Sequence, residues 1–196
     1  MIAFSKTMIG LAGAATAAAF LAAPAAAQID NRDPARFVQG IANTGLSSLR
    51  GDRNLARGKF RNLLAQHFAV DAIGDRLIRR HRATITPAQY RAYKQAFPGF
   101  IIGTYADRLY PYASAQVKVV RAQNQGANAA VLTQVTREGA RPANVVWSLV
   151  RVGNGYKVTN LTVSGVNVAV AQEADFNSYI QRNGFDRLIA FLRSRA

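Results

Sequence analysis

Apolar residues recur at every third or fourth position through the first half of the chain, a spacing that predicts amphipathic helices. Asp33-Pro34 has the order of an N-cap followed by a proline at the first helical position, and Gly51 ends this helix. Asp52 can cap a second helix, in which an apolar residue returns every fourth position over 60–68. Helical character then continues over 73–82.

The next helix has a well-formed start in the sequence Thr-Pro-Ala-Gln at 86–89. The Thr86 side chain can accept from the Gln89 backbone amide, while the Gln89 side chain reaches back to the Thr86 backbone amide. This pair of hydrogen bonds makes a capping box. The apolar pattern continues to Leu109 but is interrupted by Pro98-Gly99. Proline removes a backbone donor, so we expect a kink or a short break at 97–99.

After residue 111 the hydrophobic period changes from 3.6 to 2, which predicts β-strands. Gly153-Asn154-Gly155 predicts a hairpin turn, and a change of phase in the last strand predicts a bulge near Thr159-Asn160. Two short helical segments follow, divided at Asn183-Gly184. The strands are expected at 116–121, 129–136, 145–149 and 156–170.

This order of elements predicts an α+β fold. Helices lie on one face of a curved antiparallel sheet of about four strands, and the chain closes with short helices. No internal repeat or linker divides the sequence. We therefore expect a single domain over 28–196.

Residues 1–27 predict a cleavable secretory signal. One early cation, Lys6, precedes a run of Ala, Leu, Ile and Phe, and Ala25-Ala26-Ala27 forms an A-x-A cleavage site. A retained membrane anchor is the alternative, but Thr16 and Pro24 interrupt the apolar run. The mature protein is expected outside the cytoplasm. ATP and NAD are not supplied there, so we expect it to work without them.

Composition narrows the chemistry further. The chain has no cysteine, which excludes disulfides and thiolate chemistry, and its two histidines, His67 and His81, do not form a metal pattern. The net charge of +15 favours acidic partners or anionic surfaces. Nucleic acid is not expected, because the protein is exported and the densest basic cluster, at 76–82, has no interleaved aromatic residues.

The order of several short motifs resembles the MlaC family, the periplasmic carriers of the Mla pathway for phospholipid transport in Gram-negative bacteria. Each motif is short, and together they span nearly the whole mature chain. The matching pieces are Phe60-Arg61-x-x-Leu64 followed by Phe68, the box at 86–89, Thr104-Tyr105-Ala106-x-Arg108-Leu109 with Tyr112, Gly155 to Val158, Ser164 to Val168, and Phe185-Asp186-x-Leu188-Ile189.

The resemblance implies a monomeric periplasmic carrier without a cofactor, with phospholipid as cargo. It implies acyl tails held in an apolar cavity between helices and sheet, and docking to an inner-membrane ABC transporter complex and an outer-membrane lipoprotein complex. A hopanoid or another lipid is the alternative cargo within the same family. At about 0.8 kcal/mol per methylene, two long tails must be enclosed rather than laid in a shallow groove.

Apolar residues near the predicted helix–sheet contact are the candidate cavity lining, although each could equally be ordinary core. Three arginines, Arg79, Arg80 and Arg108, are candidates for contact with a lipid phosphate or an acidic partner. The candidate lipid-binding residues are Phe68, Ile73, Phe97, Phe100, Ile101, Tyr105, Leu109, Val131, Val145, Trp147, Leu149, Val163 and Val166.

Two other classes of function stay open. Related cone-shaped α+β folds include pocket enzymes in which an aspartate acts as base, here Asp107 or Asp175. However, the sequence shows no nucleophile with a base and an orienting group, so no catalytic residue is expected. A structural module of the cell envelope would have a filled core and no cargo.

Overall fold

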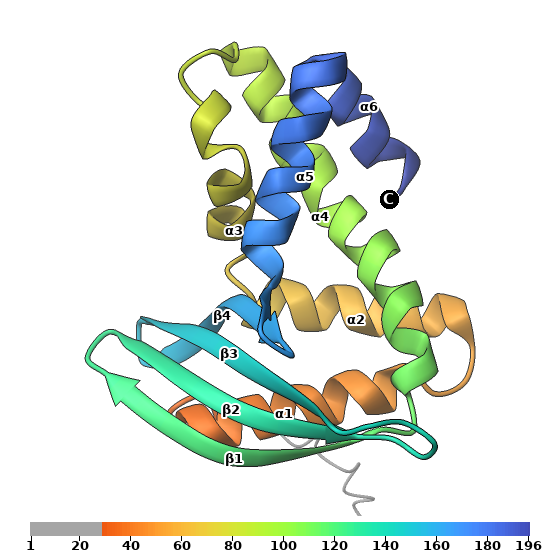
Figure 1. The fold of residues 1–196 in the computed structure, drawn as a ribbon, viewed down its shortest axis with the longest axis vertical. Coiled ribbons are helices and arrows are strands. Elements are labelled where there is room, and N and C mark those ends of the chain that lie inside the picture. The colour runs from red at the N-terminus through yellow and green to blue at the C-terminus, as the bar shows by residue number, and fades with distance from the viewer. Residues whose placement is uncertain (1–28) are drawn as a thin grey trace, which may run out of the picture.

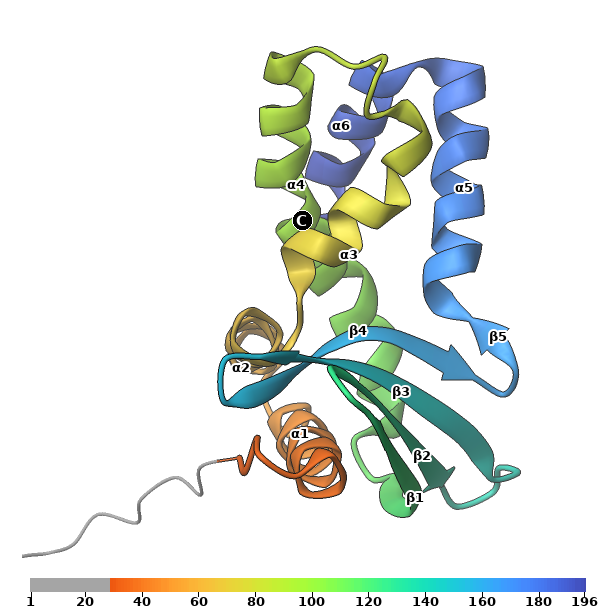
Figure 2. The same cartoon turned by 90° about the vertical axis from the view of Figure 1, so that its left-hand side faces the viewer.

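The structure is a computed structural model that describes residues 29–196, so the predicted signal at 1–27 lies outside the described residues. The helices are α1 (Pro34–Ser48), α2 (Arg53–His67), α3 (Val70–Leu77), α4 (Pro87–Leu109), α5 (Val168–Asn183) and α6 (Phe185–Ser194), with short 3-10 turns η1 (Arg79–His81) and η2 (Tyr110–Tyr112). Along the chain, helices α1 to α4 come first, the sheet follows, and helices α5 and α6 come last (Figures 1 and 2).

The sheet is antiparallel and its strands follow one another in chain order, which confirms the α+β prediction. Four strands are long, and the fifth has two residues. Among residues 29–196 no helix is both long and apolar enough to cross a bilayer. The strands are β1 (Gln116–Gln125), β2 (Asn128–Thr136), β3 (Ala143–Val152), β4 (Gly155–Val163) and β5 (Val166–Asn167).

The last strand is shorter than the prediction of 156–170. β4 ends at Val163, and Ser164 and Gly165 then turn the chain with φ values of 48° and 87°. The Asn167 side chain accepts from the Val170 amide at 3.0 Å and so starts α5. The alternating valines of this segment match a strand pattern, but the Asn167 cap starts a helix at Val168.

The predicted bulge lies at Thr159. Val158 pairs with Leu149 while Asn160 pairs with Ser148, so Thr159 is an extra residue in β4. The bulge restores the phase of the strand. Val158 before it and Leu161 after it consequently both face the inner side of the sheet, where they pair with Leu149 and Trp147.

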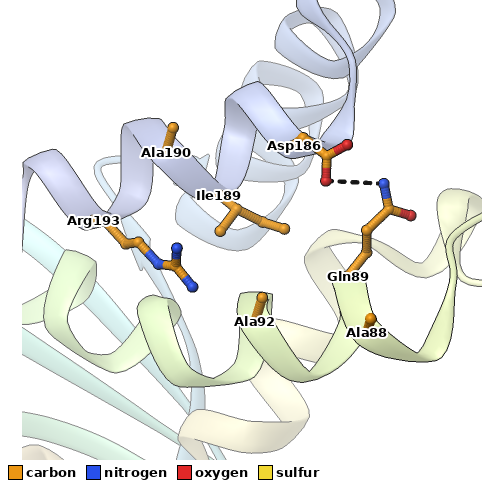
Figure 3. Close-up of a pocket in the computed structure, with 7 residues that line it drawn as sticks. All are labelled: Ala88, Gln89, Ala92, Asp186, Ile189, Ala190 and Arg193. Carbon is orange, nitrogen blue, oxygen red and sulfur yellow. Dashed lines mark hydrogen bonds between the residues drawn. The ribbon is translucent and has the colours of Figure 1, made fainter.

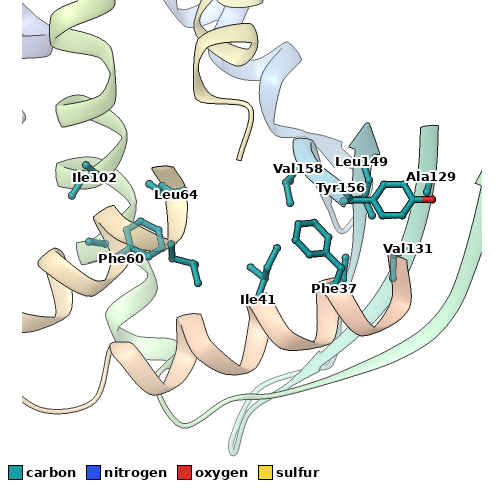
Figure 4. Packing of buried hydrophobic residues seen from close by; sticks show 13 residues of the cluster. Phe37, Ile41, Phe60, Leu64, Ile102, Ala129, Val131, Leu149, Tyr156 and Val158 are labelled. Carbon is teal, nitrogen blue, oxygen red and sulfur yellow. The ribbon is translucent and has the colours of Figure 1, made fainter. Parts of the chain in front are cut away.

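Thirteen buried apolar residues form one cluster between the sheet and the helices α1, α2 and the end of α4, here called the sheet cluster (Figure 4). From α1, Phe37 and Ile41 project toward Val158 and Val131 on the strands. The cluster consists of Phe37, Val38, Ile41, Phe60, Leu63, Leu64, Ile102, Ala106, Ala129, Val131, Leu149, Tyr156 and Val158.

A second cluster of the same size lies away from the sheet, here called the helix cluster. It packs α3, α5 and α6 around the first part of α4, and the buried Tyr93 hydroxyl donates to the Gly74 carbonyl at 2.8 Å. Its residues are Leu77, Ile78, Tyr93, Ala96, Phe97, Phe100, Ala169, Phe176, Ile180, Phe185, Leu188, Ile189 and Leu192.

Helix α4 joins the two clusters. It starts with the predicted capping box, in which the Gln89 amide donates to the Thr86 hydroxyl at 3.1 Å. The helix is continuous through Pro98 and is bent, so the expected kink is present and the alternative, a short break, is not (Figure 2). Phe100 belongs to the helix cluster, Ile102 belongs to the sheet cluster, and Ile101 packs against both.

Candidate functional site

A crevice of about 450 Å³ opens where the two clusters meet. One wall comes from the end of α2 and the start of α3, and the opposite wall comes from α4 at its proline. The β3–β4 hairpin closes a third side. The lining residues are Arg61, Leu64, Ala65, Phe68, Ala69, Val70, Asp71, Ala72, Pro98, Ile101, Ile102, Val152 and Lys157.

The joint between α2 and α3 is held to the sheet by a backbone contact. The Ala69 amide donates to the Val158 carbonyl at 2.9 Å, and Phe68 forms an isolated parallel bridge with Val158. This contact fixes the ends of the two helices beside the crevice. Small side chains at Ala65, Ala69 and Ala72 leave the space between them unfilled.

The crevice is apolar and only partly covered by protein. Phe68, Val70 and Ile101 are half-buried, and the last two pack against both clusters. Half-buried apolar side chains grouped in one concave place are typical of a ligand site rather than of a finished core. The volume falls within the range of small-ligand pockets, roughly 300–1,000 Å³.

The structure separates the sequence-predicted lining residues into groups. Only Phe68 and Ile101 line the crevice. Phe97 and Phe100 lie inside the helix cluster, and Val131 and Leu149 lie inside the sheet cluster. These four fill packed interior in the structure described here.

The remaining candidates lie at the edges of the two clusters. Ile73, Tyr105 and Trp147 are half-buried against cluster residues, and the Trp147 indole donates to the Thr133 hydroxyl at 3.0 Å. The Tyr105 hydroxyl contacts Gln172 of α5 at 3.4 Å, and burial raises the pKa of Tyr105. Val145 is buried, whereas Leu109, Val163 and Val166 are exposed.

The three candidate arginines do not converge on the crevice. Arg79 and Arg80 both approach the carboxylate of Glu173 on α5, at 3.8 and 3.7 Å. Glu173 is buried, so this pair of cations offsets the cost of burying its charge. Arg108 is exposed and lies over the Tyr105 ring, with 5.9 Å between its guanidinium carbon and the ring centroid.

The carboxylates that could serve an enzyme lie on the surface. Asp107 is paired with Arg57 at 2.7 Å, and Asp175 is exposed on α5. Neither residue lines the crevice. Within residues 29–196, no group of three or more His, Asp or Glu side chains lies close enough to hold a metal ion.

A second hollow, of about 330 Å³, lies between α4 and α6 (Figure 3). Its lining includes Asp186 and Arg193, and the Gln89 side-chain amide donates to the Asp186 carboxylate at 3.0 Å across it. Ala92 and Ile189 provide the apolar part of the surface. Two charged groups on α6 and the smaller volume make it a weaker site for an apolar ligand than the crevice.

Comparison with known proteins assigns the family. The model of the MlaC protein family matches residues 35–194. The chain belongs to the MlaC family. It is 25% identical over 162 residues to toluene tolerance protein ttg2D of Pseudomonas putida, covering 78% of this chain and 75% of that protein.

A solved structure has the same fold as this MlaC-family protein. It is a phospholipid-binding protein from Ralstonia solanacearum in complex with a phospholipid, with a TM-score of 0.65 and 23% sequence identity. The match covers 81% of this chain and 93% of the other. At this identity the likeness confirms the arrangement of helices and sheet.

Several crevice residues were missed from the sequence. Leu64 and Arg61, near the end of α2, both line the crevice but are not among the candidates from the sequence. Val70 and Lys157 were not singled out. A usable signal was present in the alanines at 65, 69 and 72, small side chains that lie around the joint between two amphipathic helices.

Neighbouring isoleucines on α4 test the distinction between lining and core. Ile102 is buried in the sheet cluster, so Ile102→Ala is expected to lower the free energy of unfolding by about 2–5 kcal/mol. Ile101 is half-buried at the crevice, so Ile101→Ala is expected to cost about 1 kcal/mol. Urea unfolding measures both. Equal costs would show that the crevice is closed in solution.

His67 reports on the charge beside the crevice. Burial lowers its pKa, and the nearby Lys157 charge lowers it further. The folded state therefore disfavours protonation, and stability falls as the pH drops below about 6.5. Lys157→Gln is expected to raise the His67 pKa part of the way, since burial remains. An NMR titration measures this shift, and an unchanged pKa would contradict the placement of Lys157.

Proposed function

We propose that this protein is a periplasmic lipid carrier that holds acyl tails in the crevice between the two clusters. The observation that carries the proposal is the group of half-buried apolar side chains around Ile101, at a point where α4 bends. Membership of the MlaC family and the phospholipid in the structural neighbour support it. The predicted signal at 1–27 would deliver the mature domain, 28–196, to that compartment.

The volume of the crevice suits one acyl chain. An apolar cavity of about 150 Å³ holds one benzene, so 450 Å³ corresponds to roughly eighteen carbons. Burying such a chain from water is worth about 14 kcal/mol at 0.8 kcal/mol per methylene. A bilayer shelters the same chain equally well, and a carrier therefore needs only an affinity comparable to that of the membrane.

A second tail requires the clusters to separate. Proline at position 98 leaves the Lys94 carbonyl without its helical donor, so α4 can flex there at lower cost than elsewhere. Of the side chains in the crevice wall, Val70 and Ile101 pack against both clusters. We infer that α4 bends further at Pro98 when phospholipid enters.

Phospholipid is thus the proposed cargo, and the proposed route runs between an outer-membrane lipoprotein complex and an inner-membrane ABC transporter complex. Family membership supports this route. A carrier of this kind needs no catalytic group and no cofactor, because its partners supply the energy and the direction. A monomer is sufficient for such a shuttle.

A transfer assay tests the carrier function. Wild-type protein is expected to extract a fluorescent phospholipid from vesicles, and Ile101→Asp is expected to reduce the amount bound at least tenfold, because a carboxylate in the crevice would be desolvated by the tail. The matched control is Leu55→Asp on α2, where the side chain is 66% exposed. Circular dichroism checks the fold of both variants. Failure of the wild type to take up lipid would overturn the proposal.

A further inference from the structure

Two cations stand at the crevice without an acidic partner. Arg61 is exposed near the end of α2 and Lys157 is half-buried on β4, and both line the crevice. In the part of the chain from 29 to 196, neither approaches a carboxylate within 4.0 Å. Most other lining side chains are apolar, which makes these charges stand out as a recognition feature.

The remaining charged lining residue lies on the opposite side and is already paired. Asp71 contacts the Lys94 ammonium at 2.6 Å, and the same ammonium lies 3.3 Å from Asp75. The α3 side of the crevice therefore carries no free cation. An anionic group would be drawn to the side formed by α2 and β4, where both unpartnered charges lie.

The placement of these cations suits an amphiphile. A lysine can lay its methylene stem on an apolar wall and keep its ammonium at the water boundary, where that ammonium can pair with an anion. Arginine offers a planar fork that binds a phosphate by two hydrogen bonds. A tail lying against Leu64 and Ile101 would leave its headgroup between the two side chains.

We propose that Arg61 and Lys157 bind the headgroup phosphate and make the crevice select lipids of net negative charge over zwitterionic ones. This inference rests on the proposed carrier function. Zwitterionic headgroups carry their own cation, which competes for the phosphate and is repelled by the two side chains. Two such contacts at a partly exposed site predict a preference of about fivefold.

The test loads the full mature chain from vesicles with equal amounts of phosphatidylglycerol and phosphatidylethanolamine, then quantifies the bound lipids by mass spectrometry. Wild-type protein is expected to be enriched about fivefold in phosphatidylglycerol. The double variant Arg61→Gln/Lys157→Gln is expected to bind the two lipids in equal amounts, because the charges that favour the anionic headgroup are gone. Enrichment that survives in this variant, or none in the wild type, would overturn the proposal.

A charge-matched control separates the site from the overall basic charge. Lys59→Gln/Lys118→Gln removes two exposed cations that do not line the crevice. This variant is expected to retain the enrichment, and its loss here would show that long-range attraction sets the preference, against the proposal. Absence of any bound lipid in all proteins would instead defeat the carrier function itself.

The source of the anion is distinguished by NMR. A headgroup beside Lys157 would offset the Lys157 charge and so raise the His67 pKa. The rise is expected with phosphatidylglycerol-loaded protein and not with inorganic phosphate alone. An equal rise with inorganic phosphate would show that the cations bind free anions without a tail, which contradicts headgroup recognition.

Discussion

The fold depends on how the chain divides its apolar side chains between two places. Each of the two clusters contains thirteen buried residues, and α4 is the helix that contributes buried residues to both. A helix with one continuous apolar stripe would press both clusters into a single core. In α4, Phe100 and Ile102 lie two positions apart and so project to nearly opposite sides of the helix, each into a different cluster. The space beside Ile101, between them, is left incompletely filled.

That incomplete packing has a cost and a use. Half-buried apolar side chains forgo part of the free energy that full burial would give, about 25 cal/mol per Å². In the proposed function, a lipid tail would recover this free energy by covering the same surface. The bend, the small alanine side chains and the backbone hydrogen bond between Ala69 and Val158 keep the space open.

Local features of the fold were predictable from the sequence because they depend on neighbouring residues. The capping box at Thr86, the bulge at Thr159 and the division of the last helices at Gly184 all follow from local hydrogen bonding and side-chain period. The predicted end of β4 was wrong, because the valines after it alternate as in a strand. The Asn167 side chain caps α5, and the chain therefore continues as a helix. The crevice was harder to predict. Phe97 and Ile101 have the same apolar character in sequence, and only the packing of other elements around α4 places Phe97 in a core and Ile101 in the crevice wall.

The most direct test of the two-cluster account is the distance between the clusters with and without lipid. The chain has no cysteine, so Gln66→Cys on α2 and Arg187→Cys on α6 give two spin labels at exposed positions, one on each side of the bend. Double electron–electron resonance then reports their separation. We expect the distance distribution to shift when a two-tailed phospholipid is bound. An unchanged distribution in protein shown to carry the lipid would contradict the account.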